Sequence, residues 1–77
     1  MVEACILIQT EIGKAAKVAH EIANVDGVTA SEVVTGPYDA IIHISAADVD
    51  SLGKLVVDRI QAVSGITRTL TCPVIKL

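Results

Sequence analysis

One turn holds the residues best suited to bind a small ligand. Gly36 permits positive φ and Pro37 sets φ near about −65°, so the chain reverses between Val33 and Ala40. Tyr38 in this turn is the only aromatic residue of the chain, and it precedes Asp39. The Asp39 carboxylate could pair with a ligand ammonium group. The alternative is an ordinary hairpin tip in which Asp39 is a turn residue.

A second candidate group lies near the C-terminus. Thr67, Thr69 and Thr71 occupy alternate positions, so they share one face if this segment is a strand. Their hydroxyls could bind the polar end of a small molecule. The alternative is that these β-branched residues simply favour an extended edge strand.

The cysteines and histidines show no catalytic pattern in the sequence. Cys5 and Cys72 lack metal or redox spacing and are predicted to be reduced, semi-buried thiols. His20 is predicted to be exposed on a helix, and His43 is predicted to lie in an interface. No pair has metal-ligand spacing, and no nucleophile has a recognisable base beside it. We therefore predict no enzyme, no metal and no cofactor.

Length and composition restrict the class of protein. The 77 residues predict one domain, 1–77, and 52% of them are hydrophobic. No apolar run approaches the roughly 18 residues of a membrane span, and the start at Met1 has no signal-peptide pattern. The net charge of −3 and pI of 5.1 argue against a nucleic-acid surface. We expect a cytoplasmic protein without membrane or direct nucleic-acid partners.

Hydrophobic periodicity predicts four strands and two helices. Asp48 is the predicted N-cap of the second helix, and Gly27 and Gly65 follow the two helices. Pro73 cannot donate to a ladder, which makes the last strand an edge strand or a bulged one. The predicted strands are 3–10, 28–34, 40–45 and 66–77, and the predicted helices are 12–24 and 49–63.

The two halves of the chain resemble each other. Val18, Ile22 and Gly27 recur as Val56, Ile60 and Gly65, at a constant offset of 38 positions. Two similar βαβ units predict an α+β, ferredoxin-like βαββαβ sandwich, in which right-handed crossovers place both helices on one sheet face.

The strands are apolar on both faces, which predicts self-association. Cys5 and Leu7 alternate with Ile6 and Ile8, so the sheet face without helices is apolar as well. An uncovered apolar face of this size usually marks an interface. We therefore expect a dimer formed by sheet-to-sheet packing.

The pattern resembles the effector-binding domain of Lrp/AsnC regulators, also called RAM. The resemblance covers essentially the whole chain and rests on these segments: Gly27-Val28, Val34-Thr35-Gly36-Pro37-Tyr38-Asp39-Ala40-Ile41-Ile42, Asp48 to Leu52, and Gly65-Ile66-Thr67-Arg68-Thr69. It implies sheet-packed dimers that assemble into rings, with amino acids bound between dimers. The implied effector contacts are Gly36, Tyr38, Asp39, Thr67, Thr69 and Thr71.

Regulators of this family begin with a helix-turn-helix domain, whereas this chain begins at the first strand of the effector domain. The resemblance thus implies a stand-alone RAM protein, an amino-acid sensor that works through ligand-linked oligomerisation, alone or with full-length Lrp/AsnC regulators. Two alternatives remain open. One is a small dimeric ferredoxin-like enzyme of the monooxygenase or isomerase type, and the other is a structural interaction domain without a ligand.

Overall fold

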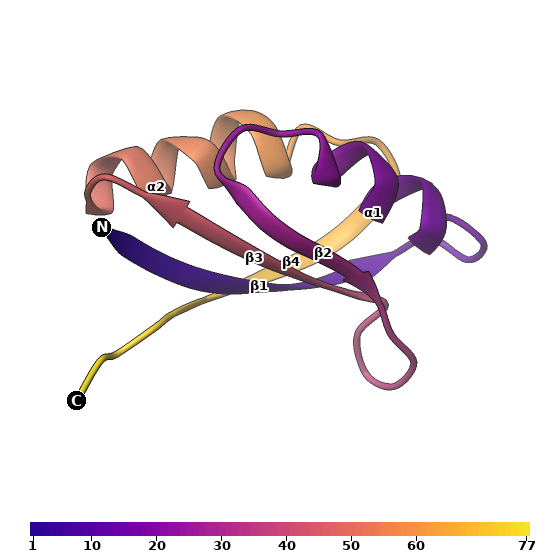
Figure 1. The fold of residues 1–77 in the computed structure, drawn as a ribbon. Coiled ribbons are helices and arrows are strands. Elements are labelled where there is room, and N and C mark those ends of the chain that lie inside the picture. The colour runs from indigo at the N-terminus through magenta and orange to yellow at the C-terminus, as the bar shows by residue number, and fades with distance from the viewer.

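The computed structural model describes all 77 residues and confirms the predicted βαββαβ order (Figure 1). A short π-helical segment, η1, continues α2. The elements are β1 Val2–Thr10, α1 Ala15–Ala23, β2 Val28–Val33, β3 Ala40–Ala46, α2 Val49–Leu55, η1 Val56–Ile60 and β4 Ile66–Pro73.

The four strands form one antiparallel sheet in the order β2-β3-β1-β4. The helices α1 and α2 both cover the same face of this sheet, as a ferredoxin-like sandwich requires (Figure 1). The central strand β1 pairs with β3 on one side and with β4 on the other. The C-terminal end of β1 therefore lies between the start of β3 and the start of β4.

The core lies between the helices and one face of the sheet. Alternate residues of β1 and β3 point into it, because successive side chains of a strand project to opposite faces. Ile6, Ile8 and Ile42 are fully buried there, as are Val18 and Ile22 of α1. Val18 and Ile22 are one helical turn apart, so they share the face of α1 that packs on the sheet.

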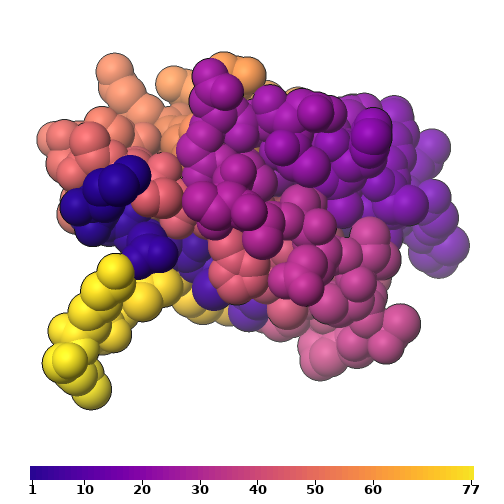
Figure 2. Space-filling view, in the orientation of Figure 1, coloured from indigo at the N-terminus to yellow at the C-terminus, as the bar shows by residue number.

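All six predicted elements differ from the observed ones at one boundary or both, most at the start of the first helix, the end of the second helix and the end of the last strand. The first helix begins at Ala15 and not at residue 12 or 13, because Gly13 has a φ of 80°, which a right-handed helix does not accommodate. The last strand ends at Pro73 and not near Leu77. Pro73 has no N–H to donate, and the residues after it leave the sheet as an extended tail, seen in yellow in Figure 2.

The predicted cap of α2 is confirmed. The side chain of Asp48 accepts a hydrogen bond from the backbone N–H of Ser51 at 2.7 Å. Because this bond stabilises the charged carboxylate, it lowers the pKa of Asp48. Gly27 and Gly65, which follow the two helical segments, have φ values of 96° and 101°. The halves therefore share their chain reversals as well as their helices.

The sheet face opposite the helices, called the outer face below, carries no cover from the chain itself. Leu7 and Ile41 on this face are half-buried, and Leu70 is 42% exposed. The C-terminal tail projects below this face at one end and the loop between β2 and β3 at the other (Figure 1). None of the helices is long and apolar enough to cross a membrane.

Candidate functional site

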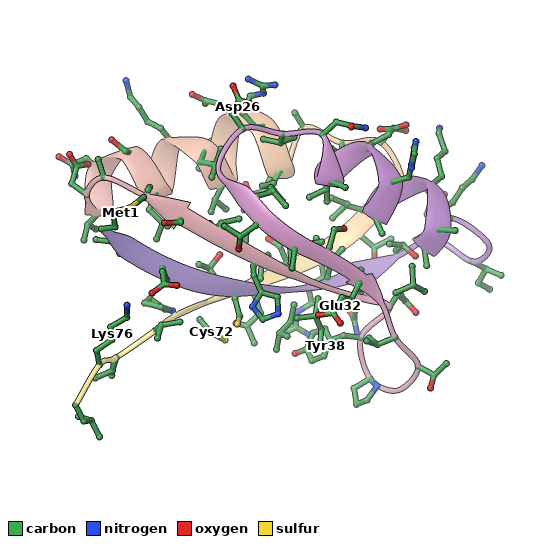
Figure 3. All side chains as sticks on the ribbon, in the orientation of Figure 1. Met1, Asp26, Glu32, Tyr38, Cys72 and Lys76 are labelled. Atoms are coloured by element: carbon green, nitrogen blue, oxygen red, sulfur yellow. The ribbon has the colours of Figure 1, made fainter.

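The loop between β2 and β3 holds the first predicted group, Gly36, Tyr38 and Asp39. Gly36 has a φ of 130°, and a Cβ there would meet nothing within 4 Å. The loop closes on itself through a hydrogen bond from the Val34 N–H to the Asp39 carbonyl at 3.0 Å. The side chain of Tyr38 is half-buried and lies on the outer side of the sheet (Figure 3).

Four hydrogen bonds fasten this loop to the end of β1, and three of them are 2.8 Å long. The Asp39 N–H donates to the Ile8 carbonyl, and the side-chain amide of Gln9 donates to the Pro37 carbonyl, both at 2.8 Å. The backbone N–H of Thr10 donates to Oδ2 of Asp39, also at 2.8 Å. These bonds restrict the loop to one conformation, so a ligand that binds it would cost the loop less conformational entropy.

The Asp39 carboxylate has a structural role in addition to any binding role. Both bonds from Thr10, from its N–H and from its hydroxyl at 3.5 Å, go to Oδ2. Oδ1 has no hydrogen bond within the chain and is free to accept one from a ligand. The two sequence interpretations of Asp39, a turn residue and a ligand-pairing carboxylate, are therefore compatible.

The threonines lie on the other side of β1, along the edge strand β4. Thr69 and Thr71 pair with Ile8 and Ile6, whose side chains point to the helices, so both threonines face the helix side of the sheet. The hydroxyl of Thr69 accepts a hydrogen bond from the side chain of Gln61 at 3.2 Å. Thr67 lies where the pairing of β1 with β4 shifts register, and its side chain is exposed.

Within one chain, the two predicted groups do not form a single site. The loop and the start of β4 lie at the same end of the sheet, but β1 runs between them, which separates them by about 10 Å. Tyr38 lies toward the outer face, whereas Thr69 and Thr71 face the helices. A ligand that contacts both groups would need a second chain to bring them together.

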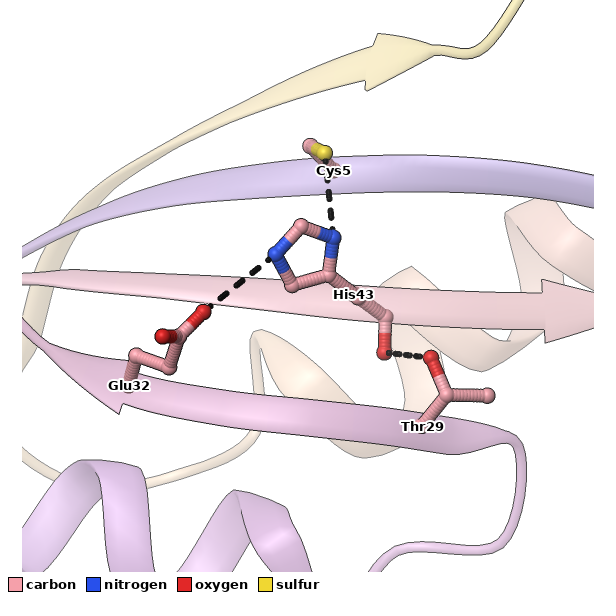
Figure 4. A network of polar contacts seen from close by, with 4 residues as sticks. All are labelled: Cys5, Thr29, Glu32 and His43. Carbon is pink, nitrogen blue, oxygen red and sulfur yellow. Dashed lines mark hydrogen bonds and ion pairs between the residues drawn. The ribbon is translucent and has the colours of Figure 1, made fainter.

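The outer face contains a polar network that the sequence did not indicate (Figure 4). Sγ of Cys5 lies 3.4 Å from Nδ1 of His43, and Nε2 of His43 lies 3.5 Å from Oε1 of Glu32. The expectation that no nucleophile has a base beside it is wrong for Cys5. The residues come from three neighbouring strands, β1, β3 and β2, so no local spacing reveals them.

One sequence signal could have pointed to this pair. Cys5 and His43 are 38 positions apart, which is the offset of the internal repeat, and they are direct partners in the β1–β3 ladder. β1 and β3 are equivalent strands of the two halves and pair antiparallel, so residues at equivalent positions meet at the centre of their ladder. No group of three His, Cys, Asp or Glu side chains is arranged to hold a metal ion.

A further charged contact lies where the tail leaves the sheet. The Lys76 ammonium pairs with the Glu3 carboxylate, and this hydrogen bond lowers the pKa of Glu3. The Val74 N–H also donates to the Glu3 carbonyl at 2.9 Å. These contacts hold the first part of the tail near the start of β1.

Comparisons with known proteins support the interpretation of the fold and the family. The profile of the Lrp/AsnC ligand binding domain matches residues 3–77. An uncharacterised HTH-type transcriptional regulator of Pyrococcus furiosus is 31% identical over 55 residues, a segment that is 71% of this chain and 37% of that protein. This chain thus matches little more than a third of that relative's length.

Two solved structures have the same fold. A protein of Thermus thermophilus superposes with a TM-score of 0.93 at 28% identity, over 100% of this chain and 96% of that one. Escherichia coli AsnC superposes with a TM-score of 0.90 at 23% identity, over 99% of this chain and 52% of that one. With the family profile matched from residue 3 to residue 77, this chain belongs to the Lrp/AsnC ligand-binding domain family.

Proposed function

We propose that this protein is an amino-acid-binding effector module of the Lrp/AsnC type, which acts through ligand-linked oligomerisation. The observation that carries the proposal is the match of essentially the whole chain to the ligand-binding domain of these regulators. The position of the β2–β3 loop supports it, because the loop is fastened to β1 while Oδ1 of Asp39 remains available.

In this proposal the ligand binds between chains. The loop of one subunit supplies Asp39 for the α-ammonium group and the backbone near Gly36 for the α-carboxylate. The edge strand of another subunit supplies the hydroxyls of Thr67, Thr69 and Thr71. Such a composite site links binding to assembly, because a ligand that binds only the assembled form stabilises it by mass action.

The outer face supplies the proposed contact within a dimer. Leu7, Ile41 and Leu70 form an apolar strip there. A chain of 77 residues buries only a modest fraction of its surface, so exposure of this strip to water would lower its stability. A second copy packed on this face would cover the strip. Dimers joined in this way would leave the tip of the β2–β3 loop and the helix-side face of β4 available for contacts between dimers.

The test is a thermal-shift screen of the twenty amino acids, followed by calorimetry and sedimentation with each compound that raises the melting temperature. We expect at least one amino acid to bind and to increase the sedimentation coefficient. If none of the twenty alters either the melting temperature or the assembly, the proposal of an amino-acid effector fails.

Variants locate the site. Asp39→Asn retains an oxygen for the Thr10 N–H but removes the charge, so it should weaken binding by about 1.5–3 kcal/mol, the value of a charge-assisted hydrogen bond. Thr69→Val should weaken binding by about 0.5–1.5 kcal/mol. Asp26→Asn removes the same charge on the helix side of the sheet (Figure 3) and should bind like the parent. Parent-like binding by Asp39→Asn would remove Asp39 from the site.

A further inference from the structure

We propose that a zinc ion binds at the centre of the outer face, between two copies of the chain, through Cys5 and His43 of each copy. The site rests on the sheet-packed dimer proposed above, because one chain supplies only half of the ligands. Within one chain, the Cys5 sulfur lies 3.4 Å from Nδ1 of His43 (Figure 4). Cys5 is a free thiol, and both a thiolate and a neutral imidazole nitrogen are zinc ligands.

The distance between these two atoms is close to that of neighbouring ligands in a zinc site. Zinc binds sulfur at about 2.3 Å and imidazole nitrogen at about 2.0–2.1 Å, in tetrahedral geometry, so two such ligands are about 3.6 Å apart. The observed 3.4 Å also fits a hydrogen bond between thiol and imidazole, and zinc would take the place of the shared proton. Binding would then need only a small movement of the two side chains.

Glu32 prepares His43 for this role. Oε1 of Glu32 lies 3.5 Å from Nε2 of His43, the ring nitrogen that does not face Cys5 (Figure 4). When Nε2–H donates to the Glu32 carboxylate, Nδ1 is unprotonated and can bind a metal. Histidine ligands almost always donate their other N–H to a carboxylate, a carbonyl or water, which fixes the tautomer and the orientation of the ring. Glu32 is therefore a positioning residue for the proposed site.

The register places Cys5 and His43 at the centre of the outer face. They form the middle pair of the β1–β3 ladder, with three pairs on either side. The strands β1 and β3 are also the two inner strands of the sheet. A symmetric dimer uses the same patch on both copies, so a two-fold axis through this centre would bring the two Cys5–His43 pairs together.

The gap between two packed sheets has room for the ion. Such sheets lie about 10 Å apart, so the midplane is about 5 Å from each backbone. A cysteine or histidine side chain and its bond to zinc together span about 5 Å. Two thiolates and two imidazoles would then surround one ion, which is a closed ligand set typical of structural zinc sites. One chain has no cluster of three ligands, so neither its sequence nor its own side-chain groups reveal the site.

The metal would also solve a problem of burial in the dimer. The His43 side chain is 42% exposed in the single chain, so sheet packing would remove water from its ring nitrogens, which then need other partners. Zinc at Nδ1 and Glu32 at Nε2 supply both. Two thiolates balance the charge of the zinc ion, and Leu7 and Ile41, the next outer-face pair of the ladder, would keep water from it.

The test uses the full chain, kept reduced, stripped of metal with a chelator and titrated with zinc chloride. We expect one zinc ion per two chains and, with zinc, a dissociation constant of the dimer at least about tenfold lower than without it. Cobalt(II) in place of zinc should give the visible absorption of tetrahedral cobalt with thiolate ligands.

Four variants assign the ligands. Cys5→Ser and His43→Gln should each weaken zinc binding about 100-fold or more, and Glu32→Gln should weaken it about tenfold. The metal-free form of Glu32→Gln should sediment like the metal-free parent, which a purely structural role of Glu32 would change. Cys72 is the matched control, because it pairs with Cys5 in the ladder but lies on the edge strand β4. Cys72→Ser should bind zinc like the parent.

The outcomes separate the zinc site from the dimer. A dimeric parent that binds zinc no more tightly than Cys5→Ser would overturn the zinc site and leave the sheet-packed dimer in place. A chain that stays monomeric with zinc would overturn both. A stoichiometry of one zinc ion per chain, or an equal loss of binding in Cys72→Ser and Cys5→Ser, would also overturn the site.

Discussion

Replacement of Asp39 separates its structural role from its charge. In the parent, the Asp39 carboxylate accepts the Thr10 N–H at 2.8 Å, and the two residues are half-buried. Asp39→Ala removes this acceptor and leaves the N–H at the end of β1 without a partner from the loop. Asp39→Asn keeps an oxygen in the same place but has no charge.

The expected loss follows from this one bond. A hydrogen bond to a charged group contributes about 1.5–3 kcal/mol to stability, and partial exposure to water at the end of the sheet places this bond at the lower end. We expect Asp39→Ala to lower the free energy of unfolding by about 1–2 kcal/mol. Asp39→Asn keeps a neutral bond and should lower it by about 0.5–1 kcal/mol. For a chain of this length, 1 kcal/mol corresponds to about 4–8 °C in Tm.

The measurement is urea unfolding followed by circular dichroism, with all proteins at the same concentration because association adds to apparent stability. The slope of the unfolding free energy with urea should stay constant among the three proteins. Equal stability of Asp39→Ala and the parent would refute the argument that this carboxylate holds the loop on β1. A larger loss for Asp39→Asn than for Asp39→Ala would also contradict it.

Three other predictions concern association, pH and backbone conformation. Sedimentation at micromolar concentration should show the parent as a dimer or larger and Leu7→Lys as a monomer. Val57→Lys, on the helix side, should associate like the parent. A monomeric parent would contradict packing through the outer face. The hydrogen bond that lowers the pKa of Asp48 below its ordinary value of 3.8 stabilises the folded state above that pH. This contribution should disappear as the pH falls through the lower pKa of the folded state. The free energy of unfolding, measured from pH 5 to pH 2, should therefore depend less on pH in Asp48→Asn than in the parent. Gly27→Ala should lower the free energy of unfolding by about 2–4 kcal/mol and Gly36→Ala by about 1–2 kcal/mol. Both glycines have positive φ, but a Cβ on Gly27 would lie 3.2 Å from the Ser45 carbonyl oxygen, whereas a Cβ on Gly36 would meet nothing within 4 Å. Equal losses in urea unfolding would contradict the steric argument.

The sequence alone was sufficient to predict the order of the elements and the family, because the signals involved are local. Short runs that are apolar on both faces indicated β1 and β3, and the helical period identified the buried faces of α1 and α2. The Asp48 cap and the turn at Gly36 also depend only on near neighbours in the chain. The boundaries at Gly13 and Pro73 were less accurate, since each depends on how far the local backbone continues a regular conformation.

Only the tertiary structure revealed which distant residues meet. The bond from the Thr10 N–H to Asp39, the network of Cys5, His43 and Glu32, and the pairing of Cys5 with Cys72 each join different strands. Residue types predict that strands exist, but the register decides which side chains face each other, and a shift of one residue would move every side chain of a strand to the opposite face. The register is set by burial across the whole sheet, which no single segment of the sequence contains.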